Sequence, residues 1–272
     1  MLKIIYKKKM VLTRENKQLF VKITVIVILF LLWLIYRLVI LSPDPIGYVS
    51  KLYCFKDVLI LDVFNGLTRF LAYDLQYRDY FLIFGSNLLD ITFLFVTTHY
   101  VLYGNGSKLI VTLGIFYPLR ALTQLFFLYE SYDMSTLFNF PGFYSLTVPL
   151  HPGVDYFFSG HVGSTSICML YFREYFKEKL FKYIGTVIVI FQAFLMLAIR
   201  GHYFIDLVFG YIIAHYVYIH AHYLSEWLDS KFAIFAPKKE TKPETKKDAR
   251  DVSLTDHLSL IVVDKTDKAM IN

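Results

Sequence analysis

The chain has 272 residues, of which 56% are hydrophobic, and its mean hydropathy is +0.49. A composition this apolar excludes an ordinary soluble domain of this length and is typical of a multi-pass membrane protein. The formal net charge of +6 is concentrated beside apolar segments near the two ends, which favours a role in membrane orientation over a nucleic-acid-binding face.

Six apolar segments predict membrane-spanning helices, each of which needs about 20 residues. The first follows a basic stretch and lacks a small-residue cleavage site, so we expect a retained anchor. The predicted spans are 19–41, 81–102, 108–128, 160–172, 182–199 and 203–224. They predict an all-α, polytopic six-helix membrane domain over 19–224, between a basic cytosolic N-terminus (1–18) and a cytosolic tail (225–272).

Between the first two spans, residues 57–75 carry apolar side chains at helical spacing with polar and charged ones between them. The apolar series is Ile60, Phe64, Leu67 and Leu71. This pattern favours an amphipathic helix that lies flat on the membrane surface. A seventh buried segment is the alternative, and the interrupting charges make it the weaker one.

The basic residues predict the orientation of the chain in the membrane. Lys and Arg crowd the N-terminus, residues 173–182 and the tail, so the positive-inside rule puts both ends in the cytosol. The segments on the opposite side are then 42–80, 129–159 and 200–202. His161 and His202 fall on that non-cytosolic face, and the sequon Asn105-Gly106-Ser107 falls in the cytosol, where it stays unglycosylated. From residue 237 onward the tail is rich in Lys, Glu, Thr and Asp, which predicts a mostly disordered segment.

His202 and Asp206 lie four residues apart at the start of the last predicted span, so they share one face of a helix. A carboxylate in that position can hold one ring N–H of the imidazole and leave the other nitrogen as a nucleophile. A carboxylate inside a span costs about 2.5–3.5 kcal/mol at the membrane centre, so such a residue usually has a function. The alternative is a polar pair that only satisfies itself at a helix end.

His161 is a second imidazole, at the start of the fourth predicted span. Ser159 can cap this helix, and Gly160 lets the backbone approach a ligand closely. The N-terminus of a helix favours anions, so a phosphate beside His161 meets free N–H groups and the positive end of the dipole. We expect His161 to transfer protons, unless it simply caps the span at the membrane interface.

Two arginines are candidates for holding phosphate oxygens. Arg120 lies in the third predicted span and Arg200 lies two residues before His202. A guanidinium binds two phosphate oxygens in a planar fork. The alternatives are an ion pair between Arg120 and Asp90 of the second span, and a role for Arg200 as an interface anchor.

The motifs resemble those of a known family. They are Asp155-Tyr156-Phe157-Phe158-Ser159-Gly160-His161 and, about 40 residues later, His202-Tyr203-Phe204-Ile205-Asp206. The pair resembles the sphingomyelin synthase-related group of the lipid phosphatase/phosphotransferase superfamily. The runs 157–164 and 200–207 are especially similar to plant phosphatidylcholine:diacylglycerol cholinephosphotransferases. Residues 108–124 resemble the arginine-bearing third span of sphingomyelin synthases.

This resemblance implies a mechanism without a metal or another cofactor. His202 would attack phosphorus, Asp206 would orient it, and His161 would protonate the departing diacylglycerol and then deprotonate the incoming alcohol. Arg120, Ser159, Gly160, Arg200 and Asp155 would contact the substrate. The donor would be a phosphatidylcholine-like lipid and the acceptor ceramide or diacylglycerol. The active site would face the non-cytosolic side of the Golgi, the endoplasmic reticulum or the plasma membrane.

Three other functions remain open from the residues. A lipid phosphate phosphatase would use the same histidines with water as the acceptor. A non-enzymatic membrane protein would keep only the fold. A metal-dependent site would use His151, His161, His202 and Asp206 as ligands.

Overall fold

The computed structural model describes residues 14–39, 58–126, 137, 139–148 and 157–232. Within these residues the chain forms seven α-helices and no strand. The helices are α1 (Arg14–Val39), α2 (Val58–Tyr73), α3 (Leu75–Tyr103), α4 (Lys108–Phe126), α5 (Gly160–Tyr175), α6 (Lys179–Ala198) and α7 (Phe204–Lys231). The seven helices belong to one compact unit, and the predicted disordered tail lies outside the described residues.

Four of the helices are long and apolar enough to cross a membrane, namely α1, α3, α6 and α7. They indicate a membrane-embedded protein. The other two predicted spans also form helices, α4 and α5, and remain predictions as spans. The observed helices extend beyond several predicted ends, and α7 in particular runs to Lys231 rather than to residue 224. Its 28 residues give a length of about 42 Å.

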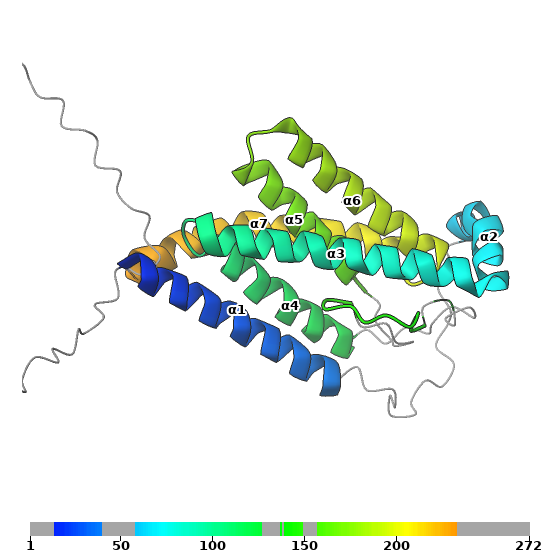
Figure 1. The fold of residues 1–272 in the computed structure, drawn as a ribbon, viewed down its shortest axis with the longest axis horizontal. Helices are drawn as coiled ribbons and strands as arrows, with labels where there is room; N and C mark the ends of the chain where they lie inside the picture. The colour runs from blue at the N-terminus through cyan, green and yellow to red at the C-terminus, as the bar shows by residue number, and fades with distance from the viewer. Residues whose placement is uncertain (1–13, 40–57, 127–136, 138, 149–156, 233–272) are drawn as a thin grey trace, which may run out of the picture. The chain divides into compact units, whose positions relative to one another are not determined.

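Helix α5 is the central element of the bundle. It packs against α3, α6 and α7, and Figure 1 shows it among them. Every residue from His161 to Phe172 is buried. Because no face of this segment meets lipid, it tolerates Gly, Ser and Thr that a lipid-facing helix would replace with larger apolar residues. Its 16 residues span only about 24 Å, less than the hydrocarbon thickness of about 30 Å.

The predicted helix over 57–75 is present, but it ends at Tyr73, and Asp74 begins α3 as its N-cap. The carboxylate of Asp74 accepts a hydrogen bond from the backbone N–H of Gln76. Figure 1 shows α2 turned across the end of α3 and α6. Phe64 packs against Phe194 of α6, with ring centroids 5.5 Å apart, and Leu71 is fully buried. The apolar face predicted for α2 therefore packs on the bundle.

Three contacts gather the predicted cytosolic segments at one end of the bundle. Lys22 of α1 donates to the carbonyl oxygen of Gly104, and the N–H of Ser107 donates to Asp229 of α7 at 3.2 Å. Lys108 pairs with Glu174 of α5 at 2.5 Å. The start of α1, the α3–α4 turn and the ends of α5 and α7 thus lie together.

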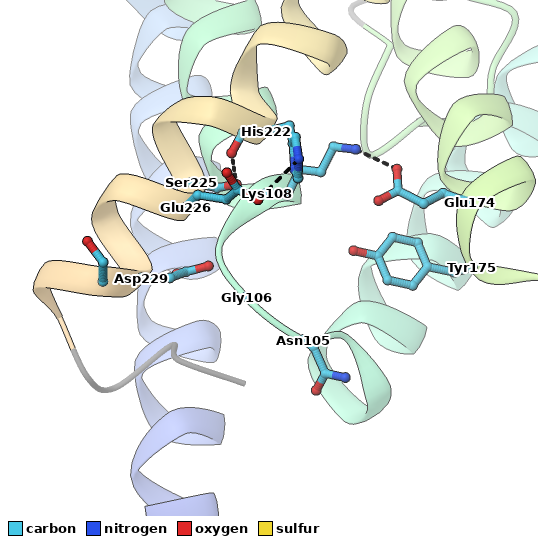
Figure 2. Close-up of a pocket in the computed structure, with 10 residues that line it drawn as sticks. Asn105, Gly106, Lys108, Glu174, Tyr175, His222, Ser225, Glu226 and Asp229 are labelled. Atoms are coloured by element: carbon cyan, nitrogen blue, oxygen red, sulfur yellow. Dashed lines mark hydrogen bonds and ion pairs between the residues drawn. The ribbon is translucent and has the colours of Figure 1, made fainter. Parts of the chain in front are cut away.

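A pocket of about 420 Å³ lies at this same end (Figure 2). Two pairs of its ionisable side chains are in contact. Lys108 of α4 pairs with Glu174 of α5. His222 and Glu226, two exposed residues of α7, lie 3.2 Å apart. The α7 residues that line the pocket begin at His222, 20 positions after His202, so the pocket is about 30 Å or more from His202 along the helix axis. It is separate from the predicted active site.

Candidate active site

His202 and Asp206 are brought together as the i, i+4 spacing predicts. The Nδ1 atom of His202 lies 3.5 Å from Oδ2 of Asp206. Their side chains are only 3% and 2% exposed. Nδ1 therefore faces the acid, and Nε2 is the ring nitrogen on the other side.

Asp206 also anchors the backbone on both sides of the site. Its Oδ2 accepts the N–H of Tyr203 at 3.0 Å, and its Oδ1 accepts the N–H of Phe157 at 3.3 Å. Its own carbonyl oxygen accepts the N–H of Ser159 at 2.9 Å. One residue of α7 thus links its own helix start to the segment that leads into α5. This anchoring of the backbone is additional to the predicted role of Asp206, which is to orient the imidazole of His202.

Phe157 adopts a left-handed backbone conformation, with φ of 98°. A bulky residue rarely takes this conformation, because its Cβ crowds the backbone. The hydrogen bond to Asp206 and stacking on Phe209, with ring centroids 5.7 Å apart, hold it there. Sequence reasoning missed this residue because nothing in the residue type indicates a positive φ.

The two imidazoles also meet. His161 is the second residue of α5 and is 7% exposed. Its ring centroid lies 6.0 Å from that of His202, with the planes at 70°. Ser159 caps α5 as predicted, since its Oγ accepts the N–H of Val162 at 3.4 Å. Two histidines 41 positions apart in the sequence thus form one cluster at the start of two helices.

Glycines allow the close crossing of α5 and α7 that creates this cluster. A Cβ added at Gly210 would lie 2.7 Å from the backbone oxygen of Ser159. A Cβ added at Gly163 would lie 2.2 Å from the ring of Phe116 and 3.4 Å from the carbonyl oxygen of Gly210. Gly210 therefore allows α7 to approach the backbone at the start of α5, and Gly163 makes room for the ring of Phe116 from α4.

We expect Gly210→Ala to lower the free energy of unfolding of the purified protein by about 1–3 kcal/mol. The backbone of Ser159 cannot rotate away from the added methyl group, so α5 and α7 must separate. Gly114→Ala is the matched control, since a Cβ there meets nothing within 4 Å. Alanine is favoured over glycine inside a helix by about 1 kcal/mol, so the control is expected to be neutral or stabilising. Equal melting of the two variants would contradict the close crossing.

Arg120 lies beside the start of α5. A Cβ added at Gly160 would lie 2.7 Å from Cζ of Arg120, so the guanidinium packs against the Cα of this glycine. Arg120 is only 7% exposed. The missing side chain of Gly160 makes room for this cation, and the approach of a ligand to the same backbone stays a prediction. The guanidinium and the positive end of the α5 dipole together favour an anion beside His161.

In the described part of the chain, Asp90 makes no ion pair with Arg120, which was the alternative to a phosphate-binding role. Asp90 is buried and accepts hydrogen bonds from a different segment, the N–H of Leu146 at 2.8 Å and the N–H of Thr147 at 2.9 Å. The hydroxyl of Thr147 donates to it at 2.5 Å. Asp90 thus supplies hydrogen-bond acceptors to the backbone amides of this segment.

Arg200 occupies the turn between α6 and α7, two residues before His202, and has a φ of 54°. Its Nε is buried and makes no hydrogen bond to the residues that the structure describes. Asp155 and His151 lie outside the described residues. Among the described ones, no group of three His, Cys, Asp or Glu side chains could hold a metal ion.

The segment that carries this site is similar to a known family. Residues 154–223 match the family described as PAP2 superfamily C-terminal. The matched segment contains His161, His202 and Asp206. It supports a function of the lipid phosphatase or phosphotransferase type, since members of this superfamily are usually phosphatases or phosphotransferases. No curated protein and no solved structure matches the chain.

Proposed function

We propose that this protein is a membrane lipid phosphotransferase that moves a phosphocholine-type headgroup from a glycerophospholipid to ceramide or diacylglycerol. The observation that carries the proposal is the buried cluster in which His202 contacts Asp206 and faces His161. The superfamily match supports the reaction type, and the resemblance of the two motifs to sphingomyelin synthases and plant cholinephosphotransferases supports the transfer.

The mechanism follows from the orientation of the rings. Because Nδ1 of His202 faces Asp206, Nε2 attacks phosphorus. A P–N bond forms, the P–O bond to diacylglycerol breaks, and His161 gives a proton to the departing alkoxide. In the second half, His161 takes the proton of the acceptor hydroxyl. The acceptor oxygen then attacks phosphorus, and the P–N bond breaks to restore His202.

The other proposed residues bind the phosphate and stabilise the charge that develops on it. Arg120 lies against the start of α5, where its guanidinium can hold phosphate oxygens beside His161. Ser159 and Gly160 begin helix α5, whose first turn offers N–H groups to the anion, although the N–H of Ser159 itself donates to Asp206. We propose that Arg200 supplies a second cation to the phosphate and that Asp155 contacts the substrate.

Burial of the cluster favours a lipid alcohol over water as the acceptor. His202 is 3% exposed and Asp206 1% exposed, so little water reaches the atoms that would carry the adduct. The proposed site lies at the end of the bundle opposite Lys22, Lys108 and Asp229. By the distribution of Lys and Arg, this is the non-cytosolic face of an endomembrane or of the plasma membrane.

The test is a headgroup-transfer assay with purified protein and phosphatidylcholine labelled in the choline. With ceramide or diacylglycerol present, we expect labelled sphingomyelin or labelled phosphatidylcholine of the acceptor's acyl composition. Without an acceptor we expect little free phosphocholine. Rapid release of free phosphocholine that no acceptor suppresses would assign a hydrolase instead. Full activity in a chelator is expected, because the proposed chemistry needs no metal.

A further inference from the structure

Helix α6 ends in a Schellman motif that leads directly into the site. The N–H of Gly201 donates to the carbonyl oxygen of Met196 at 2.9 Å, and the N–H of Arg200 donates to that of Leu197 at 3.2 Å. The left-handed residue in this motif is usually glycine, but here it is Arg200. This conformation is unfavourable for an arginine and persists only where the surrounding structure holds it.

The motif leaves the carbonyl oxygen of Ala198 without a donor from its own helix. The donor comes from α2, since Oγ1 of Thr68 donates to this oxygen at 2.9 Å across 130 positions of sequence. Thr68 is 0% exposed. The hydrogen bond is therefore shielded from water, and no solvent molecule replaces it when the hydroxyl is removed.

The bond acts on the turn that carries two of the proposed site residues. Ala198 is two positions before Arg200 and four before His202. The intervening Ile199 is fully buried and His202 is 3% exposed, whereas Arg200 and Gly201 between them are half-buried, so buried residues fix both ends of the turn. A shift of the Ala198 carbonyl is thus transmitted to the guanidinium and to the nucleophile.

We propose that Thr68 is a positioning residue, whose hydroxyl holds the α6–α7 turn so that Arg200 and His202 keep their reactive orientation. The inference rests on the proposed function for its catalytic consequence. Its physical reason is that a strained turn relaxes when one of its restraints is lost. Displacement of a reacting group by about 1 Å is enough to cost up to about 100-fold in rate.

The test compares Thr68→Val, which removes the hydroxyl at nearly constant volume, with Thr68→Ser, which keeps it. Thr112→Val is the matched control. Thr112 is also 0% exposed, but its hydroxyl donates to Lys108 within its own helix at 2.8 Å. We expect Thr68→Val to lower kcat about 10-fold with a smaller change in KM. Thr68→Ser is expected to have a kcat within about twofold of wild type, and Thr112→Val is expected to have the wild-type kcat.

Hydrogen exchange supplies a readout that does not depend on activity. The amides of Arg200 and Gly201 donate within the turn, so Thr68→Val is expected to speed their exchange while Thr112→Val does not. Unchanged exchange in Thr68→Val overturns the inference, as does a loss of kcat that Thr112→Val shares or that serine does not rescue. An inactive wild-type protein, by contrast, overturns the proposed function, and the exchange result still decides whether Thr68 holds the turn.

Discussion

Replacement of His202 with glutamine is expected to lower headgroup transfer by about 10⁴-fold or more and to abolish the covalent adduct. Glutamine keeps a polar side chain at this position but has no nucleophilic nitrogen. The measurement is transfer from labelled phosphatidylcholine, together with trapping of the labelled adduct by rapid quenching at alkaline pH. Elution of the variant as a single species in size-exclusion chromatography shows that it is folded.

The chain offers a matched control for this substitution. His222 pairs with Glu226 at the same i, i+4 spacing and at 3.2 Å, but the two side chains are 52% and 65% exposed at the far end of α7. His222→Gln is therefore expected to leave transfer unchanged. If His202→Gln kept both activity and adduct, the nucleophile would have to be another residue.

His161 is distinguished from His202 by the leaving group. A donor whose leaving alcohol is acidic needs no proton as it departs. With p-nitrophenyl phosphocholine as the donor, we expect His161→Gln to release p-nitrophenol at much of the wild-type rate. His202→Gln is expected to stay defective with this donor. Equal defects of the two variants with this donor would contradict the roles assigned to the two rings.

Replacement of Asp206 with asparagine is expected to have two separable effects. The rate falls by about 10³- to 10⁴-fold, because a neutral amide does not stabilise the imidazolium at His202 or enforce its tautomer. Stability falls as well, because the amide NH₂ cannot accept the N–H of Tyr203 or Phe157 as a carboxylate oxygen does. One buried donor left unsatisfied costs about 1–3 kcal/mol.

The measurements are kcat at a temperature well below the melting transition and the thermal midpoint in detergent. Asp62→Asn is the control, since Asp62 lies on the exposed side of α2 and is expected to change neither quantity. A variant of Asp206 that melts early but turns over normally would show that this carboxylate only anchors the backbone. Normal stability with normal turnover would contradict both roles.

Local patterns were sufficient for part of the site. The i, i+4 spacing of His202 and Asp206 predicts their contact because helix geometry depends on neighbouring residues alone. The cap at Ser159 is equally local. The prediction of six spans is supported for four helices. Helix α5 is short and poor in large apolar residues because it is surrounded by other helices, and a hydropathy pattern does not register that environment.

Contacts between distant segments were beyond the reach of these patterns. The sequence allows Asp90 as a partner of Arg120, but Asp90 binds the backbone of Leu146 and Thr147, some 56 positions away. Gly160 is predicted to let the backbone approach a ligand, and the structure adds that the guanidinium of Arg120 packs against this glycine. Both outcomes depend on how helices and loops pack, which no periodicity encodes.

The amino-acid sequence by itself determined the apolar helices, the basic flanks and the pairing of an imidazole with an acid on one turn, because each depends on residues within a few positions. Only the tertiary structure decided that His161 lies 6.0 Å from His202, that Asp206 binds the N–H of Phe157, and that Thr68 holds the carbonyl of Ala198. These contacts join residues 41, 49 and 130 positions apart, and only the close crossing of α5 with α7 and the packing of α2 on α6 bring them together.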